Sequence, residues 1–184
     1  MSDFTKSFVD YLQVLAQRDR GALAALRRSL GFDPGTYPAA FPVVERFVGS
    51  NTAREPLRQA MYLTAGLFAI NSRQQLGRPF AMALAQVMQD RGSASIERRF
   101  IAVLSADVEG LPTHLRYAVQ LLAAGEQALD FTWLLDDLSV LLDPWRLDER
   151  DRVRQRWARD FYRHVAAADA DRVEAESAIE SQAD

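Results

Sequence analysis

Six arginines fall within sixteen consecutive positions near the C-terminal end of the chain, in the segment RDRVRQRWARDFYRHV at residues 150–165. Successive residues of an α-helix are rotated by about 100°. A helix here would therefore place four guanidinium groups on one narrow strip: Arg152, Arg156, Arg159 and Arg163. Guanidinium binds phosphate through two parallel hydrogen bonds. The pattern is typical of a surface that meets a nucleic-acid backbone.

Like charges one helical turn apart repel one another, at about a few tenths of a kcal/mol per pair. Nearby carboxylates, such as Asp160, offset only part of this repulsion. A row of four arginines that repel one another is favoured where an anionic partner neutralises their charge. The alternative is a solvated polar face with salt bridges to a neighbouring helix or subunit, and the sequence of this helix leaves both open.

The opposite side of the same helix carries the positions that we expect to face the core: Val153, Trp157, Phe161 and Val165. Arg154 falls among these apolar positions. We expect its side chain either to extend toward solvent or to pair with a buried acid, Asp136 or Asp137.

Arginines on other predicted helices allow a basic surface that several helices build together. They are Arg27 and Arg28 (preceded by Arg18 and Arg20), Arg98 and Arg99, and Arg116.

Features of an enzyme are missing from the sequence. The chain has no cysteine and two histidines, His114 and His164, which lie far apart and outside any metal-ligand spacing. We expect both on the surface, His164 at an exposed helix end. The adjacent Asp136 and Asp137 would point about 100° apart on a helix and form no catalytic pair. No glycine-rich phosphate loop is present. We expect no catalytic activity, no cofactor and no metal.

Charge is distributed unevenly along the 184 residues. Residues 1–168 hold 21 basic and 19 acidic side chains, a net of +2, whereas residues 169–184 hold one arginine and six acids, a net of −5. We expect residues 1–168 to form a single helical domain, as one unit or as two lobes sharing a core. The acidic tail at 169–184 is expected to be disordered or a frayed helix. No apolar run reaches the about 20 residues of a membrane-spanning helix. A soluble cytoplasmic protein is expected.

The spacing of apolar residues is helical throughout and predicts an all-α fold, a compact bundle of about eight or nine helices. Asp130 and Ser93 are predicted N-caps, and Pro79 suits the first turn of a helix. Among the clearer helices that we predict are those over 39–48, 54–70, 112–124 and 148–166.

Three tryptophans offer an alternative function. A helical adaptor that binds only proteins would use tryptophans as interface anchors. Trp133 and Trp157 have apolar neighbours and are predicted to lie in the core, whereas Trp145 follows Pro144 and is the best candidate for an exposed anchor.

The order of the motifs resembles a known family. ALRRSLG is followed by the ERRF helix, then by DFTWLLDDL, and finally by WARDFY. Over roughly residues 8–163 this order is similar to that of the CasB family, the small subunit of the type I-E CRISPR surveillance complex Cascade. No single motif is diagnostic, and the ordered set carries the resemblance.

The resemblance implies an all-helical, non-catalytic protein that joins the other Cascade subunits. Two copies would pair end to end along a guide-RNA complex. Basic patches would stabilise the heteroduplex of guide RNA and target DNA and hold the displaced strand of the R-loop. By analogy with the family, the contacts are Arg27, Arg28, Arg116, Arg152 and Arg154. Helix geometry adds Arg98, Arg99, Arg156 and Arg159. The chain departs from the family in its single lysine, Lys6, and its acidic tail.

Overall fold

The computed structural model describes residues 3–48 and 55–180, with side chains described as far as residue 170. In chain order the helices are α1 (Asp3–Arg18), α2 (Arg20–Ser29), the short 3₁₀ helix η1 (Pro38–Ala40), α3 (Phe41–Val48), α4 (Glu55–Ile70), α5 (Phe80–Arg91), α6 (Ala94–Ser105), α7 (Leu111–Ala124), α8 (Phe131–Leu141) and α9 (Leu147–Glu180). The all-α prediction is confirmed: these ranges contain nine α-helices, and their only β-pairing is an isolated bridge between Gln74 and Leu129.

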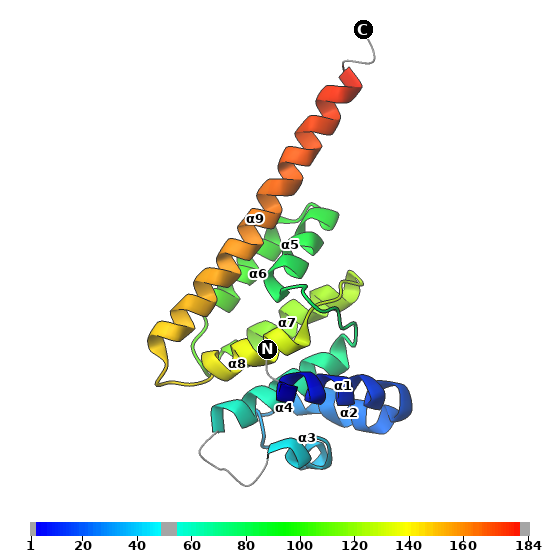
Figure 1. Ribbon diagram of the computed structural model, residues 1–184, viewed down its shortest axis with the longest axis vertical. Coiled ribbons are helices and arrows are strands. Elements are labelled where there is room, and N and C mark those ends of the chain that lie inside the picture. The colour runs from blue at the N-terminus through cyan, green and yellow to red at the C-terminus, as the bar shows by residue number, and fades with distance from the viewer. Residues whose placement is uncertain (1–2, 49–54, 181–184) are drawn as a thin grey trace.

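Helix α4 forms the centre of the lower half of the molecule, with α2 and α8 packed against it (Figure 1). Every residue from Ala60 to Ala69 is buried. This stretch contains no charged residue, and a helix that is apolar on all sides is stable only when it is surrounded by protein. Helix α4 is therefore enclosed by protein on all its sides along this stretch, and not on one face only.

Helix α2 crosses α4 at Gly66, where the two helices approach very closely. A Cβ atom at Gly66 would lie 2.6 Å from Leu30 Cδ2 and 3.2 Å from the carbonyl oxygen of Leu26. Only glycine allows this approach without displacing α2.

The N-terminus of α8 is tied to the loop between α4 and α5 through Asp130, which is 1% exposed. Its carboxylate accepts hydrogen bonds from the Thr132 amide (2.9 Å), the Gly77 amide (2.8 Å) and Gln74 Nε2 (3.2 Å). The prediction that Asp130 caps α8 is confirmed. Burial alone would raise the pKa of Asp130, but the hydrogen bonds from Thr132 and Gly77 hold it below its ordinary value.

Several local predictions are corrected. Trp133 is 42% exposed, so its placement in the core is wrong, whereas Trp157 is 2% exposed as expected. The final helix was expected to end near residue 166 but continues to Glu180, because alanines there favour helix and no glycine or proline interrupts it. His164 consequently lies within α9 rather than at a helix end, and its Nε2 is 2.9 Å from Gln86 Oε1.

Two other predictions have different outcomes. Ser93 does occupy the N-cap position of α6, but its hydroxyl makes no capping hydrogen bond there. The division into a domain at 1–168 and an acidic tail at 169–184 stays a prediction.

None of the described helices combines the length and the apolar character needed to cross a membrane.

We predict that Gly66→Ala destabilises the protein by up to about 2 kcal/mol. Alanine gains about 1 kcal/mol in helix propensity, but overpacking against Leu30 costs about 1–3 kcal/mol. Urea denaturation measures the change. The double variant Gly66→Ala/Leu30→Ala should be less destabilised than the sum of the single variants, because the truncated side chain leaves room for the new methyl group. A stabilising Gly66→Ala would contradict the close crossing.

We predict that Asp130→Ala lowers the free energy of unfolding by about 3 kcal/mol near neutral pH, because buried donors lose their acceptor. The pKa of this carboxyl is lower in the folded state than its ordinary 3.8. Its stabilisation is therefore complete above that value and is lost as the pH falls through the folded-state pKa. Denaturation at a series of acid pH values should show a shallower loss of stability in the variant. Parallel curves would refute this role.

Candidate nucleic-acid interface

The orientation of α9 is set by its apolar side. Phe161 stacks on Phe100 of α6 with ring centroids 4.2 Å apart, and Trp157 packs against Phe80 of α5 at 5.0 Å. Val153 on the same side is also buried. The predicted division of this helix into a core-facing strip and a basic strip is confirmed for these residues.

The basic strip of α9 is exposed to solvent. Arg152, Arg159 and Arg163 are exposed, and within the described residues none of them makes a hydrogen bond or an ion pair. Arg163 was left out of the predicted contacts, although its angle on the helix already placed it in the strip. These three guanidinium groups are available to an external anion.

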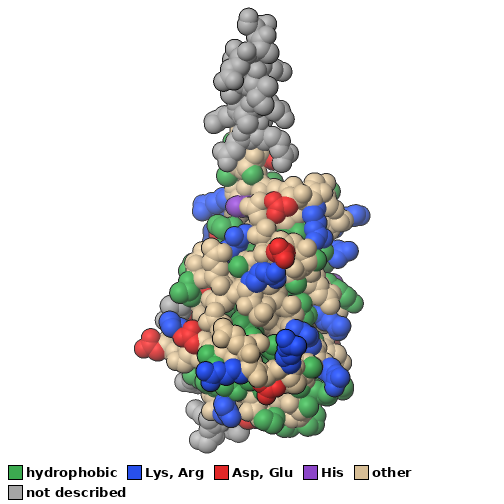
Figure 2. All heavy atoms as spheres, turned by 90° about the vertical axis from the view of Figure 1, so that its right-hand side faces the viewer, with side chains coloured by type: hydrophobic (Ala, Val, Ile, Leu, Met, Phe, Trp, Pro, Cys, Tyr) green, Lys and Arg blue, Asp and Glu red, His purple; other side chains and the backbone are tan. Residues whose placement is uncertain are grey.

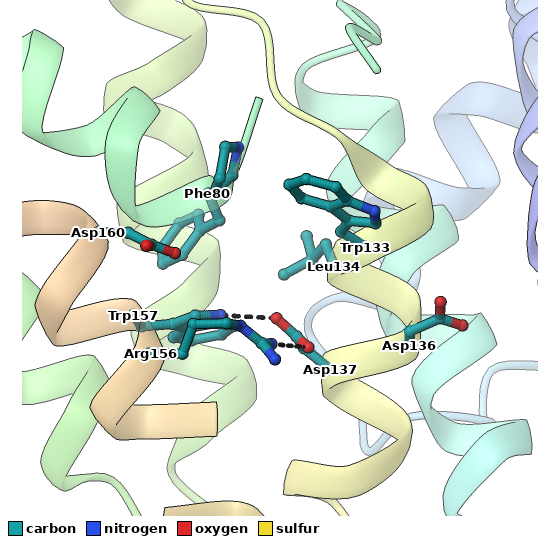
Figure 3. A pocket seen from close by; sticks show the side chains of 9 residues that line it. Phe80, Trp133, Leu134, Asp136, Asp137, Arg156, Trp157 and Asp160 are labelled. Atoms are coloured by element: carbon teal, nitrogen blue, oxygen red, sulfur yellow. Dashed lines mark hydrogen bonds and ion pairs between the residues drawn. The ribbon is translucent and has the colours of Figure 1, made fainter. Parts of the chain in front are cut away.

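Arg156 belongs to the strip but is engaged. It forms an ion pair with Asp137 of α8, and Asp137 also accepts a hydrogen bond from Trp157 Nε1 at 2.7 Å (Figure 3). Burial raises the pKa of Asp137 even though Arg156 opposes the shift. Arg156 therefore helps to fasten α9 to α8.

Of the two alternatives predicted for Arg154, pairing with Asp136 or Asp137 is wrong. Its Nη2 donates to the carbonyl oxygen of Ala106 at 2.6 Å, and its Nη1 lies 3.6 Å from Asp151. Ala106 caps the C-terminal end of α6, where carbonyl groups lack partners inside the helix and the helix dipole favours a cation. Arg154 is thus an anchor between α9 and α6.

Two arginines, Arg58 and Arg116, are among the residues that line an open hollow of about 750 Å³ between α7 and the turn after α2. Arg116 of α7 lines this hollow and has no hydrogen-bond or ion-pair partner among the described side chains. The other arginine in the lining, Arg58, is neutralised by Glu45 at 2.6 Å and Glu55 at 3.3 Å. The free positive charge in the lining comes from Arg116, and the carboxylates of Asp33 and Glu109 line the same hollow without an ion-pair partner among the described residues.

The arginine pair of α2 has divided roles. Arg27 Nε donates to the carbonyl oxygen of Ala69 at 2.5 Å, which holds α2 against the end of α4. Arg28 is exposed and unpaired within the described part of the chain. It lies just before Leu30, where the lining of the hollow begins. Arg28 is not itself among the lining residues, so of these two free arginines only Arg116 lines the hollow.

Arg98 and Arg99 lie on α6, beside its contact with α9. The preceding residue, Glu97, accepts a hydrogen bond from Tyr162 of α9 at 2.9 Å. Both arginines are exposed and without a partner in the described ranges. At 100° per residue both turn away from the face of α6 that Glu97 and Phe100 direct toward α9.

The nine arginines predicted to contact nucleic acid thus fall into two sets, those that bond to the protein and those that do not. Three are engaged with the protein: Arg27, Arg154 and Arg156. The six that have no partner within the described residues are Arg28, Arg98, Arg99, Arg116, Arg152 and Arg159.

The elements that carry the free arginines do not all lie on one side. In Figure 1, α2 lies at the lower right and the first turns of α9 lie at the left edge of the molecule. Figure 2 shows basic side chains spread over the right-hand face, with few acidic side chains between them. We call Arg28 of α2 and Arg116, which lines the hollow, the hollow group, and Arg152, Arg159 and Arg163 the α9 group.

We predict that the two kinds of arginine differ in their effect on stability. Arg154→Ala should lower the free energy of unfolding by about 1–2 kcal/mol, because the Ala106 carbonyl loses a charged donor. Arg152→Ala, two residues away, should change it by less than about 0.5 kcal/mol. Chemical denaturation of both variants measures the difference. Equal losses would mean that Arg152 is also an anchor.

Comparison with known proteins assigns the family. The family model described as "CRISPR-associated protein Cse2" matches residues 22–162 of this chain. A relative of that name from Thermus thermophilus is 41% identical over 173 residues, covering 92% of this chain and 96% of the relative. The solved structure of CasB from Thermus thermophilus has a TM-score of 0.74 at 41% identity, covering 88% of this chain and 99% of that one.

A chain of a structure described as "CRISPR RNA-guided surveillance complex, pre-nicking" has a TM-score of 0.75 at 25% identity, covering 91% of this chain and 97% of that chain. The match of the family description over most of the chain, together with the identity to the Thermus relative, shows that this protein belongs to the Cse2 (CasB) family of CRISPR-associated proteins.

Proposed function

We propose that this chain is the small, non-catalytic subunit of a guide-RNA surveillance complex of the type I-E Cascade kind. In that role it binds the backbone of nucleic acid through its free arginines. One observation carries the proposal: six of the nine arginines predicted to make these contacts have no partner within the described part of the protein. Membership of the Cse2 family and the likeness to a chain of a surveillance complex support it.

Backbone contacts suit such a complex because the guide RNA reads the target sequence by base pairing. Exchange of a DNA duplex for a guide–target heteroduplex is nearly balanced in free energy, and protein contacts to the backbone can tip it. We propose that the hollow group and the α9 group serve different strands, one the heteroduplex and the other the displaced DNA strand. The position of α2 and the start of α9 at different edges of the molecule supports this division.

The proposed partners are guide RNA, target DNA, the other Cascade subunits and a second copy of this chain, all in the cytoplasm. A purely protein-binding adaptor remains the competing function. Trp145 is 90% exposed and Leu147 is exposed beside it, which fits a protein contact in the turn between α8 and α9. In the proposed complex this turn and the arginine groups have separate tasks.

The proposal predicts that loss of either group weakens target capture. Arg28→Ala/Arg116→Ala and Arg152→Ala/Arg159→Ala are each assembled into the complete complex with guide RNA, and capture of duplex target is followed by electrophoretic mobility across a salt series. We expect at least roughly a tenfold loss at about 0.15 M salt, because charge-assisted hydrogen bonds to phosphate are lost. Each lost contact should also reduce the salt slope by about 0.7–0.9.

A matched control removes the same charge from engaged residues. Lys6 pairs with Asp10 at 2.6 Å and Arg73 pairs with Glu126 at 3.0 Å, so Lys6→Ala/Arg73→Ala should capture target like the unmodified protein. Normal capture by the hollow-group variant would exclude Arg28 and Arg116 as contacts. If both arginine variants assemble and capture target normally, the adaptor function is favoured.

A further inference from the structure

A pocket of about 310 Å³ lies between α8, α9 and the start of α5, and the proposed binding of nucleic acid does not account for it. Figure 3 shows its aromatic walls, with Trp133 of α8 opposite Phe80 of α5, and Trp157 of α9 below them. Leu134 closes the inner side. We call this space the α8–α9 pocket.

Trp133 is the unusual member of these walls. It is 42% exposed, although it lies on a helix whose other large apolar residues, such as Phe131 and Leu135, are buried. Trp157 is covered and donates its indole N–H to Asp137, whereas the indole of Trp133 makes no hydrogen bond within the described residues. An open aromatic ring on the wall of a pocket is a feature of binding sites.

The charges of the lining favour a cation. Asp137 and Asp160 line the pocket with one cation, Arg156, which is already paired with Asp137, whereas the carboxylate of Asp136 points away from the pocket (Figure 3). Asp160 has no hydrogen-bond or ion-pair partner in the described part of the chain. Phosphate would be repelled by the unpaired carboxylate of Asp160, so a nucleic acid is a poor occupant. The faces of aromatic rings attract cations.

We propose that the α8–α9 pocket binds the side chain of an arginine from a partner protein. The planar guanidinium stacks on the indole of Trp133 and donates hydrogen bonds to Asp160, and the aliphatic part of the side chain packs on Phe80 and Leu134. Complementary charge and flat aromatic walls select this occupant. The assignment is independent of the proposed contacts to nucleic acid, because the two sites share none of the free arginines.

The test uses the full chain and two small probes, N-acetyl-arginine amide and its uncharged isostere N-acetyl-citrulline amide. The indole N–H signals of the three tryptophans are followed by NMR during titration. We expect saturable shifts of the Trp133 and Trp157 signals with the arginine probe, and little change with citrulline. Trp145, which is 90% exposed and lies outside the pocket, provides an internal control.

Variants identify the residues responsible. Trp133→Ala and Asp160→Asn should each weaken binding of the arginine probe at least about tenfold, as read from the Trp157 signal. Asp148→Asn removes an exposed carboxylate of the same helix outside the pocket and should leave the affinity unchanged. Circular dichroism confirms that each variant is folded.

Three results would overturn the assignment: no saturable shift with the arginine probe, equal binding of the citrulline probe, or unchanged affinity in both folded pocket variants. None of these results bears on target capture by the arginine groups, so the two proposals fail separately.

Discussion

The packing of the aromatic side of α9 against α5 and α6 determines which of its arginines are exposed to solvent. Phe161 on Phe100 and Trp157 on Phe80 fix the rotation of α9 about its own axis. Because a helix is rigid at the scale of a side chain, that rotation decides which arginines face the protein and which face solvent. The contact between Phe80 and Trp157 also forms one wall of the α8–α9 pocket. Both proposed binding sites on α9 therefore depend on aromatic packing that itself carries no charge.

Arginine serves two different purposes in this protein. Arg27 and Arg154 donate to carbonyl oxygens at the ends of helices, where backbone acceptors lack partners, and Arg156 joins α9 to α8 through Asp137. These arginines stabilise the arrangement of helices. Arg116 and Arg152 have no such partner in the described ranges. A guanidinium group suits both purposes because its several donors match a carbonyl, a carboxylate or a phosphate equally well.

The sequence was a good guide to helices and a poorer guide to individual contacts. Apolar periodicity and the cap at Asp130 locate elements reliably because both are local properties of the chain. The partner of Arg154 could not be inferred, because Ala106 is a backbone acceptor 48 positions away whose availability depends on how α6 ends. Trp133 was misplaced for a related reason. Apolar residues surround it in sequence, and periodicity does not distinguish the wall of an open pocket from the core.

The close crossing of α2 and α4 at Gly66 has a consequence for the kinetics of association. Leu30 packs closely against Gly66, so α2 has little freedom to slide or rotate, and the backbone that carries Arg28 keeps a fixed direction relative to α4. A preorganised backbone loses little conformational entropy when a ligand arrives. No slow rearrangement of the fold would then precede binding of a polyanion to the face that carries Arg28. The association rate constant would depend on long-range electrostatic attraction and would fall as the ionic strength rises.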